Sequence, residues 1–72
     1  MNKFKYNLAV IGLGYVGLPL AVEAANSKLK VAGYDINESL VDSLNKSTSH
    51  VEDISDKVLQ DAISKDLLFT SD

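Results

Sequence analysis

Three short apolar runs divide the chain, and the segments between them carry apolar residues at helical spacing. The runs cover residues 6–11, 30–34 and 67–70. Each is short and rich in aliphatic or aromatic residues, which is typical of strands in a parallel sheet. The first run ends directly before Gly12 and indicates a fully buried strand, and the second ends directly before Asp35.

Apolar residues at three- and four-residue spacing predict helices over residues 15–27, 38–45 and 56–64. Asn37 and Ser55 are the expected N-caps of the second and third helices, because their side chains can accept a hydrogen bond from a first-turn amide. The residues expected to face inward share this spacing: Val16, Leu20, Ala24, Ala21 and Ala25 in the first helix; Leu40, Val41 and Leu44 in the second; and Val58, Leu59, Ala62 and Ile63 in the third.

The order of these elements is strand, helix, strand, helix, helix, strand, which predicts an α/β fold with a parallel sheet and right-handed crossovers. A doubly wound sheet has the strand order 3-2-1-4-5-6, so we expect a partial Rossmann fold with three strands in the order 3-2-1. Residues 6–11 then lack the neighbour that a fourth strand would supply. An exposed apolar edge of this kind promotes self-association.

The segment GLGYVG fits the pattern G-x-G-x-x-G between the first strand and the first helix. Gly12 permits a tight turn, Gly14 lets a pyrophosphate approach the backbone, and Gly17 lets the helix pack against the strand. The amide groups near Tyr15 and Val16, at the helix start, would face the phosphates. The spacing therefore points to a phosphate-binding turn.

The acid Asp35 ends the second strand, 18 residues after Gly17. A carboxylate at this point accepts hydrogen bonds from a ribose diol and repels the 2′-phosphate of NADP. Strand, glycine turn, helix and acid together predict a dinucleotide site for NAD. The expected cofactor-binding residues are Gly12, Gly14, Tyr15, Val16, Gly17 and Asp35.

Other sites built on a glycine turn fit less well. A P-loop needs G-x-x-x-x-G-K-[ST], and no lysine follows Gly17 at that spacing. A methyltransferase usually has an acid near the end of the first strand, where Val10 and Ile11 stand here. A flavin site uses the same turn and stays open as an alternative.

The turn and its surroundings resemble the amino-terminal signature of the UDP-glucose/GDP-mannose dehydrogenase family. Residues 10–21 (VIGLGYVGLPLA), 33–37 (GYDIN) and 68–72 (LFTSD) carry the resemblance. Residues 49–56 (SHVEDISD) are similar to the branch that oxidises UDP-N-acetylhexosamines, such as UDP-N-acetylmannosamine or UDP-N-acetylglucosamine. In this family the backbone at Tyr15 would touch the pyrophosphate, while its side chain only lines the cleft.

The resemblance implies an NAD-dependent oxidoreductase that oxidises the 6-hydroxyl of a UDP-sugar to the uronic acid, for surface polysaccharide biosynthesis. The family reduces two NAD in two steps, the second through a thiohemiacetal on cysteine. Its members are several times longer, with the catalytic cysteine and lysine downstream. We therefore expect residues 1–72 to be the amino-terminal part of a dinucleotide-binding domain, inactive alone. Leu40 stands where the family often has a basic residue, which would weaken NAD binding.

Two other functions share parts of this pattern. A non-catalytic NAD-sensing domain, of the kind that regulates potassium transport, has the same turn, helix and acid. Such domains usually join the second helix to the third strand by a short connection, whereas residues 47–65 form a loop and an extra helix here. An NADP-dependent hydroxyacid dehydrogenase usually has an arginine after the second strand, where Ile36 and Asn37 stand.

Composition narrows the class of partner and the compartment. The net charge is −3 without a basic patch, which argues against nucleic acid. The absence of cysteine excludes a thiolate zinc site in this chain, and His50 alone cannot form a metal site. Lys3 and Lys5 precede an apolar stretch, but glycines interrupt it and it is shorter than the ~20 residues of a spanning helix. We expect a cytoplasmic homo-oligomer without a membrane partner. We expect His50 in its polar loop to be solvated or capping, and a substrate or cofactor role is the alternative, since such a loop can approach the ligand face.

Overall fold

The computed structural model describes residues 6–72, so Lys3 and Lys5 lie outside the described residues. In chain order the elements are β1 (Leu8–Ile11), α1 (Gly17–Asn26), β2 (Val31–Tyr34), α2 (Glu38–Asn45), α3 (Asp56–Ile63) and β3 (Leu67–Thr70). The three strands run parallel, with β2 between β1 and β3. The predicted α/β class and the 3-2-1 strand order are confirmed.

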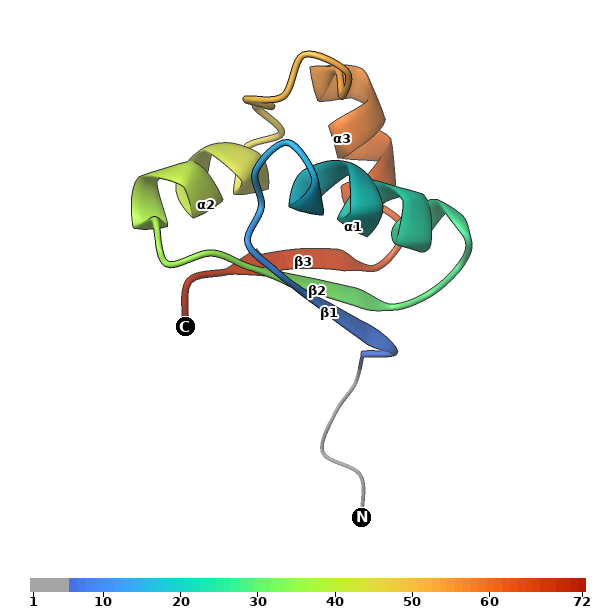
Figure 1. The fold of residues 1–72 in the computed structure, drawn as a ribbon. Helices are drawn as coiled ribbons and strands as arrows, with labels where there is room; N and C mark the ends of the chain where they lie inside the picture. The colour runs from blue at the N-terminus through green and yellow to red at the C-terminus, as the bar shows by residue number, and fades with distance from the viewer. Residues whose placement is uncertain (1–5) are drawn as a thin grey trace.

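The molecule has two layers, because α1, α2 and α3 all cover the same face of the sheet (Figure 1). Successive right-handed crossovers that step in one direction place their helices on one face, which explains this arrangement. The strand residues that point toward the helices are Leu8, Val10, Val31, Gly33, Leu67 and Phe69. The hydrophobic core therefore lies between the sheet and the helical layer.

The other face of the sheet, which we call the free face, carries no helix of the described part of the chain (Figure 1). Ile11 is 73% exposed and Leu68 is 44% exposed on it. β1 is also an edge strand, since it pairs with β2 alone in the described sheet. The expected exposed edge is confirmed, but the expectation of a fully buried first strand is wrong because no described element covers its second face.

The inward face of α1 differs from the one predicted. Val16 precedes the helix and is 81% exposed, and Leu20 is 53% exposed. Gly17 lies against the backbone of Gly12, and this contact sets the rotation of α1 about its axis. The buried residues of α1 are consequently Leu18, Ala21, Val22, Ala24 and Ala25.

The starts of α2 and α3 are where the capping residues predict them. Asn37 Oδ1 accepts a hydrogen bond of 3.1 Å from the Leu40 amide, and Ser55 Oγ accepts one of 3.1 Å from the Val58 amide. The predicted inward residues of α2 are confirmed as buried or half-buried. In α3, Val58 is 40% exposed, because a helix rotates each residue by about 100° and the adjacent Leu59 takes the core position.

None of the helices within residues 6–72 combines the length and the apolar character that crossing a bilayer requires.

Candidate functional site

The glycine turn, residues 12–17, joins β1 to α1 at the carboxyl end of the sheet. Gly12 has φ +92°, a value that side chains with a Cβ rarely adopt. A Cβ on Gly17 would overlap the Gly12 carbonyl oxygen and lie 2.8 Å from the attached carbon. Both positions therefore require glycine for the fold itself, as the sequence predicted.

Gly14 is different, because nothing lies within 4 Å of the Cβ that it lacks. Its φ is not positive, so the backbone there would accept a side chain. The fold therefore leaves open space above Gly14. That space is what the predicted approach of a pyrophosphate to the backbone requires.

The start of α1 offers backbone amides without partners. Its N-cap, Val16, makes no side-chain hydrogen bond, and the first turn has no acid. By contrast, α2 and α3 each have a side-chain cap and an acid in the first turn. Within residues 6–72, no acceptor is hydrogen-bonded to the amides of Gly14, Tyr15 or Val16. Free amides and a positive helix end together attract an anion.

The Asp35 carboxylate is held beside this turn. Its Oδ2 accepts a hydrogen bond of 2.9 Å from the Leu13 amide, and its Oδ1 accepts one of 3.0 Å from the Asn37 amide. Hydrogen bonds from the Leu13 and Asn37 amides, with a smaller effect of the charge on His50, lower the pKa of Asp35. A carboxylate has about four acceptor positions, so two remain for other donors.

His50 reaches the glycine turn, through a contact with Leu13 that sequence reasoning did not identify. Its Nε2 atom lies 2.6 Å from the carbonyl oxygen of Leu13. The two residues are 37 positions apart, so no local pattern reveals the contact. His50 stays exposed, as the expected solvated role requires, but its imidazole bonds a distant turn and does not cap its own loop.

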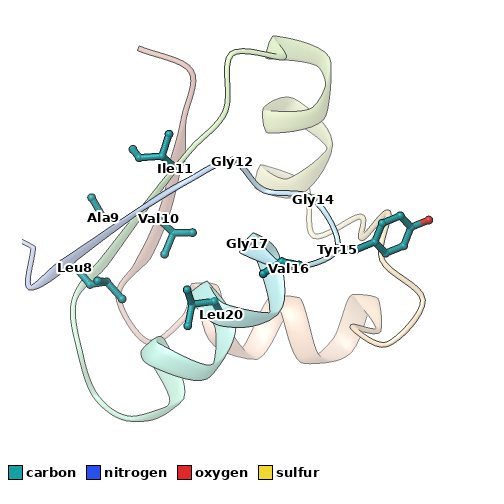
Figure 2. A pocket seen from close by; sticks show the side chains of 10 residues that line it. All are labelled: Leu8, Ala9, Val10, Ile11, Gly12, Gly14, Tyr15, Val16, Gly17 and Leu20. Atoms are coloured by element: carbon teal, nitrogen blue, oxygen red, sulfur yellow. The ribbon is translucent and has the colours of Figure 1, made fainter.

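An open groove of about 550 Å³ runs from the glycine turn along the free edge of β1. Figure 2 shows the side chains that line it. Gly14 is among the residues that line this groove, so the open space beside Gly14 belongs to it. Figure 2 also shows the Tyr15 ring pointing away from β1. Asp35 is not in the lining, because it lies on the β2 side of the turn. The lining residues are Leu8, Ala9, Val10, Ile11, Gly12, Gly14, Tyr15, Val16, Gly17 and Leu20.

The predicted site residues thus lie together at one end of the sheet, in the turn and just after β2. Leu40 is half-buried and packs against the core. At this position the chain therefore uses a side chain for packing and supplies no positive charge to a cofactor.

Comparison with known proteins gives one family and closely similar structures. The model of the UDP-glucose/GDP-mannose dehydrogenase family, NAD binding domain, matches residues 6–72. The UDP-N-acetyl-D-mannosamine dehydrogenase of Campylobacter jejuni is 51% identical over 51 residues, which are 71% of this chain and 12% of that protein.

Two solved structures are similar over 90% of this chain and 16% of their own. They are a UDP-D-ManNAc dehydrogenase from Pyrococcus horikoshii, with a TM-score of 0.83 and 37% identity, and a UDP-glucose dehydrogenase from Pyrobaculum islandicum, with a TM-score of 0.83 and 39% identity. The chain therefore spans only 12% to 16% of the length of these relatives.

Proposed function

We propose, on the premise that the chain belongs to the UDP-glucose/GDP-mannose dehydrogenase family, that its glycine turn and Asp35 bind NAD. The observation that carries this proposal is the group of free amides at Gly14, Tyr15 and Val16 beside an anchored carboxylate. The amides suit a pyrophosphate, and the carboxylate suits a ribose diol. Gly12 and Gly17 give the turn its shape.

The residues of this chain bind and orient the cofactor. The free amides would hold the pyrophosphate, and the two unused acceptor positions of Asp35 would hold the ribose hydroxyls. Bound NAD supplies a hydride acceptor. A phosphate on the ribose 2′ position would lie against the ionised Asp35, so NAD is preferred over NADP.

We also propose an activity for a protein that contains these residues and is as long as the relatives named above. Residues 1–72 would be the amino-terminal part of a larger dinucleotide-binding domain, in an enzyme that oxidises a UDP-sugar 6-hydroxyl to the uronic acid for surface polysaccharide. The relatives named above act on a UDP-N-acetylhexosamine or on UDP-glucose, which supports a nucleotide sugar as substrate. We also propose a homo-oligomer and a cytoplasmic location, where NAD and nucleotide sugars are available.

A function as an NAD-sensing regulatory domain is less well supported than a function as a dehydrogenase. The loop and α3 (Asp56–Ile63) between α2 and β3 lengthen a connection that is usually short in such domains. The named relatives are dehydrogenases. These two observations support the dehydrogenase proposal.

Calorimetric titration of the chain with NAD and with NADP tests the cofactor site. We expect weak NAD binding, because residues 1–72 supply only part of the cofactor cleft, and still weaker NADP binding. Gly14→Val should weaken NAD binding further while the far-UV circular dichroism spectrum stays unchanged. Tighter binding of NADP, or full affinity in Gly14→Val, would refute the site.

The activity is tested in the longest natural reading frame that contains these residues. NADH formation is measured with UDP-N-acetylmannosamine, UDP-N-acetylglucosamine and UDP-glucose in parallel. We expect turnover of one of these nucleotide sugars. NAD binding without turnover of any of them would favour the NAD-sensing function.

A further inference from the structure

Both backbone polar groups of Leu13 bond to side chains from distant parts of the chain. The Leu13 amide donates to Asp35 Oδ2 at 2.9 Å, and the Leu13 carbonyl oxygen lies 2.6 Å from His50 Nε2. The Leu13 side chain is fully buried, and its Cδ2 would lie 3.0 Å from a Cβ on Gly33. Leu13 is therefore fixed through its amide, its carbonyl and its side chain.

These contacts set the direction of the neighbouring peptide groups. A trans peptide is planar, so its C=O and N–H point in opposite directions, and no described peptide bond is cis. The His50 contact with the Leu13 carbonyl thereby aims the Gly14 amide away from His50. The Asp35 contact with the Leu13 amide likewise aims the Gly12 carbonyl away from Asp35, and that carbonyl lies against Gly17 of α1.

The loop that carries His50 is anchored on both sides of the imidazole. Before it, the Ser49 amide donates to Asp56 Oδ1 at 2.8 Å, at the start of α3. After it, Val51 is 3% exposed and belongs to the core. Ser49 Oγ also accepts from the Val51 amide at 3.1 Å. The imidazole is thus delivered to the turn by a fixed loop.

We infer that His50 is a positioning residue for the glycine turn: its Nε2–H holds the peptide between Leu13 and Gly14 so that the Gly14 amide faces the phosphates of the dinucleotide. This inference rests on the proposed NAD site. It adds a residue that neither the glycine pattern nor the acid after β2 contains. The loop between α2 and α3, which carries His50, then has a role in cofactor binding.

The chemistry of the contact fixes which nitrogen carries the proton. A carbonyl oxygen only accepts, so Nε2 must be the donor. That N–H is present in the imidazolium and in one of the two neutral tautomers, and only the tautomer protonated on Nδ1 lacks it. The contact therefore persists when the imidazole gains or loses its second proton.

The experiment uses the 72-residue chain, in which His50 is the only histidine, so imidazole ¹⁵N signals have a single source. In the wild type we expect Nε2 to carry a proton across the neutral range. His50→Leu removes the donor, so we expect the Gly14 amide resonance to differ from that of the wild type when no ligand is present. We also expect the affinity for NAD to fall about 3- to 10-fold, which is the effect of losing one typical hydrogen bond. His50→Gln, which restores an N–H, should recover most of that affinity.

Glu52→Gln is the matched control, because it changes the charge of the same loop by one unit at an exposed residue. It should leave the Gly14 resonance and NAD affinity unchanged. A neutral imidazole in the wild type that carries its proton on Nδ1 and leaves Nε2 bare would overturn the inference, even if His50→Leu fails to fold. A folded His50→Leu with wild-type NAD affinity would also overturn it and leave the proposed function standing. Absence of NAD binding in the wild type would refute the proposed function and, with it, the role of His50 in cofactor binding.

Discussion

Replacing Gly17 with alanine adds one methyl group between α1 and the strand end that precedes it. The new Cβ would overlap the Gly12 carbonyl oxygen and lie 2.8 Å from the carbonyl carbon. Carbon atoms make favourable contacts at about 3.5 Å or more, so the helix must retreat by at least ~0.7 Å. Because the neighbour is backbone, no side-chain rotation can relieve the overlap.

The expected loss of stability is large for a chain of this size. Overpacking costs about 1–3 kcal/mol, and a clash between backbone atoms belongs at the upper end. At about 0.05–0.15 kcal/mol per residue, the 72 residues have a free energy of unfolding of roughly 4–11 kcal/mol. A loss of about 3 kcal/mol then lowers the melting temperature by roughly 12–24 °C.

Gly14→Ala is the matched control in the same turn. Nothing lies within 4 Å of its Cβ, and its φ is not positive. The substitution should leave stability unchanged or raise it by about 0.4–1 kcal/mol, through the lower entropy of the unfolded chain. Thermal unfolding by circular dichroism measures both variants. A Gly17→Ala variant as stable as the wild type, or a strongly destabilised Gly14→Ala, would refute this account of the turn.

Three further predictions concern Asp35 and the free face. Asp35→Asn should remove the preference for NAD over NADP in calorimetry, and an unchanged preference would place the ribose elsewhere. Because the Leu13 and Asn37 amides lower the pKa of Asp35, its carboxylate contributes stability above the ordinary pKa of 3.8. That contribution is lost as pH falls through the lowered pKa, so melting curves of wild type and Asp35→Asn should converge in acid; a constant difference would contradict this. The chain should self-associate in sedimentation at high micromolar concentration and Ile11→Lys should weaken the association, whereas a monomeric wild type would exclude it.

The elements of this fold are predictable where local chemistry specifies them. Asn37 and Ser55 each cap a helix at the predicted residue, because a cap bonds an amide only three positions ahead. The strand order follows from the alternation of strands and helices, which leaves few ways to connect a parallel sheet. Gly12 and Gly17 are predictable for the same reason, since the turn between β1 and α1 needs them sterically.

The features that the sequence did not reveal depend on partners far away in the chain. The contact of His50 with Leu13 joins residues 37 positions apart and has no periodic signal. The exposure of Val16 and Leu20 depends on how the Gly17 contact rotates α1, which apolar spacing alone does not encode. Hydrophobic periodicity finds a helix, but packing decides which of its apolar residues are buried.

The most direct test of the central claim is a titration of the ¹⁵N-labelled chain with NAD, followed by amide chemical shifts. We expect the amides of Gly14, Tyr15 and Val16 to shift most, because they are free donors of the turn. The amides of Leu40 and Val58, in the first turns of α2 and α3, should stay unchanged, since the cap side chains already accept from them. Shifts confined to residues outside the glycine turn, or no shift at all with millimolar NAD, would contradict the claim that this turn holds the dinucleotide.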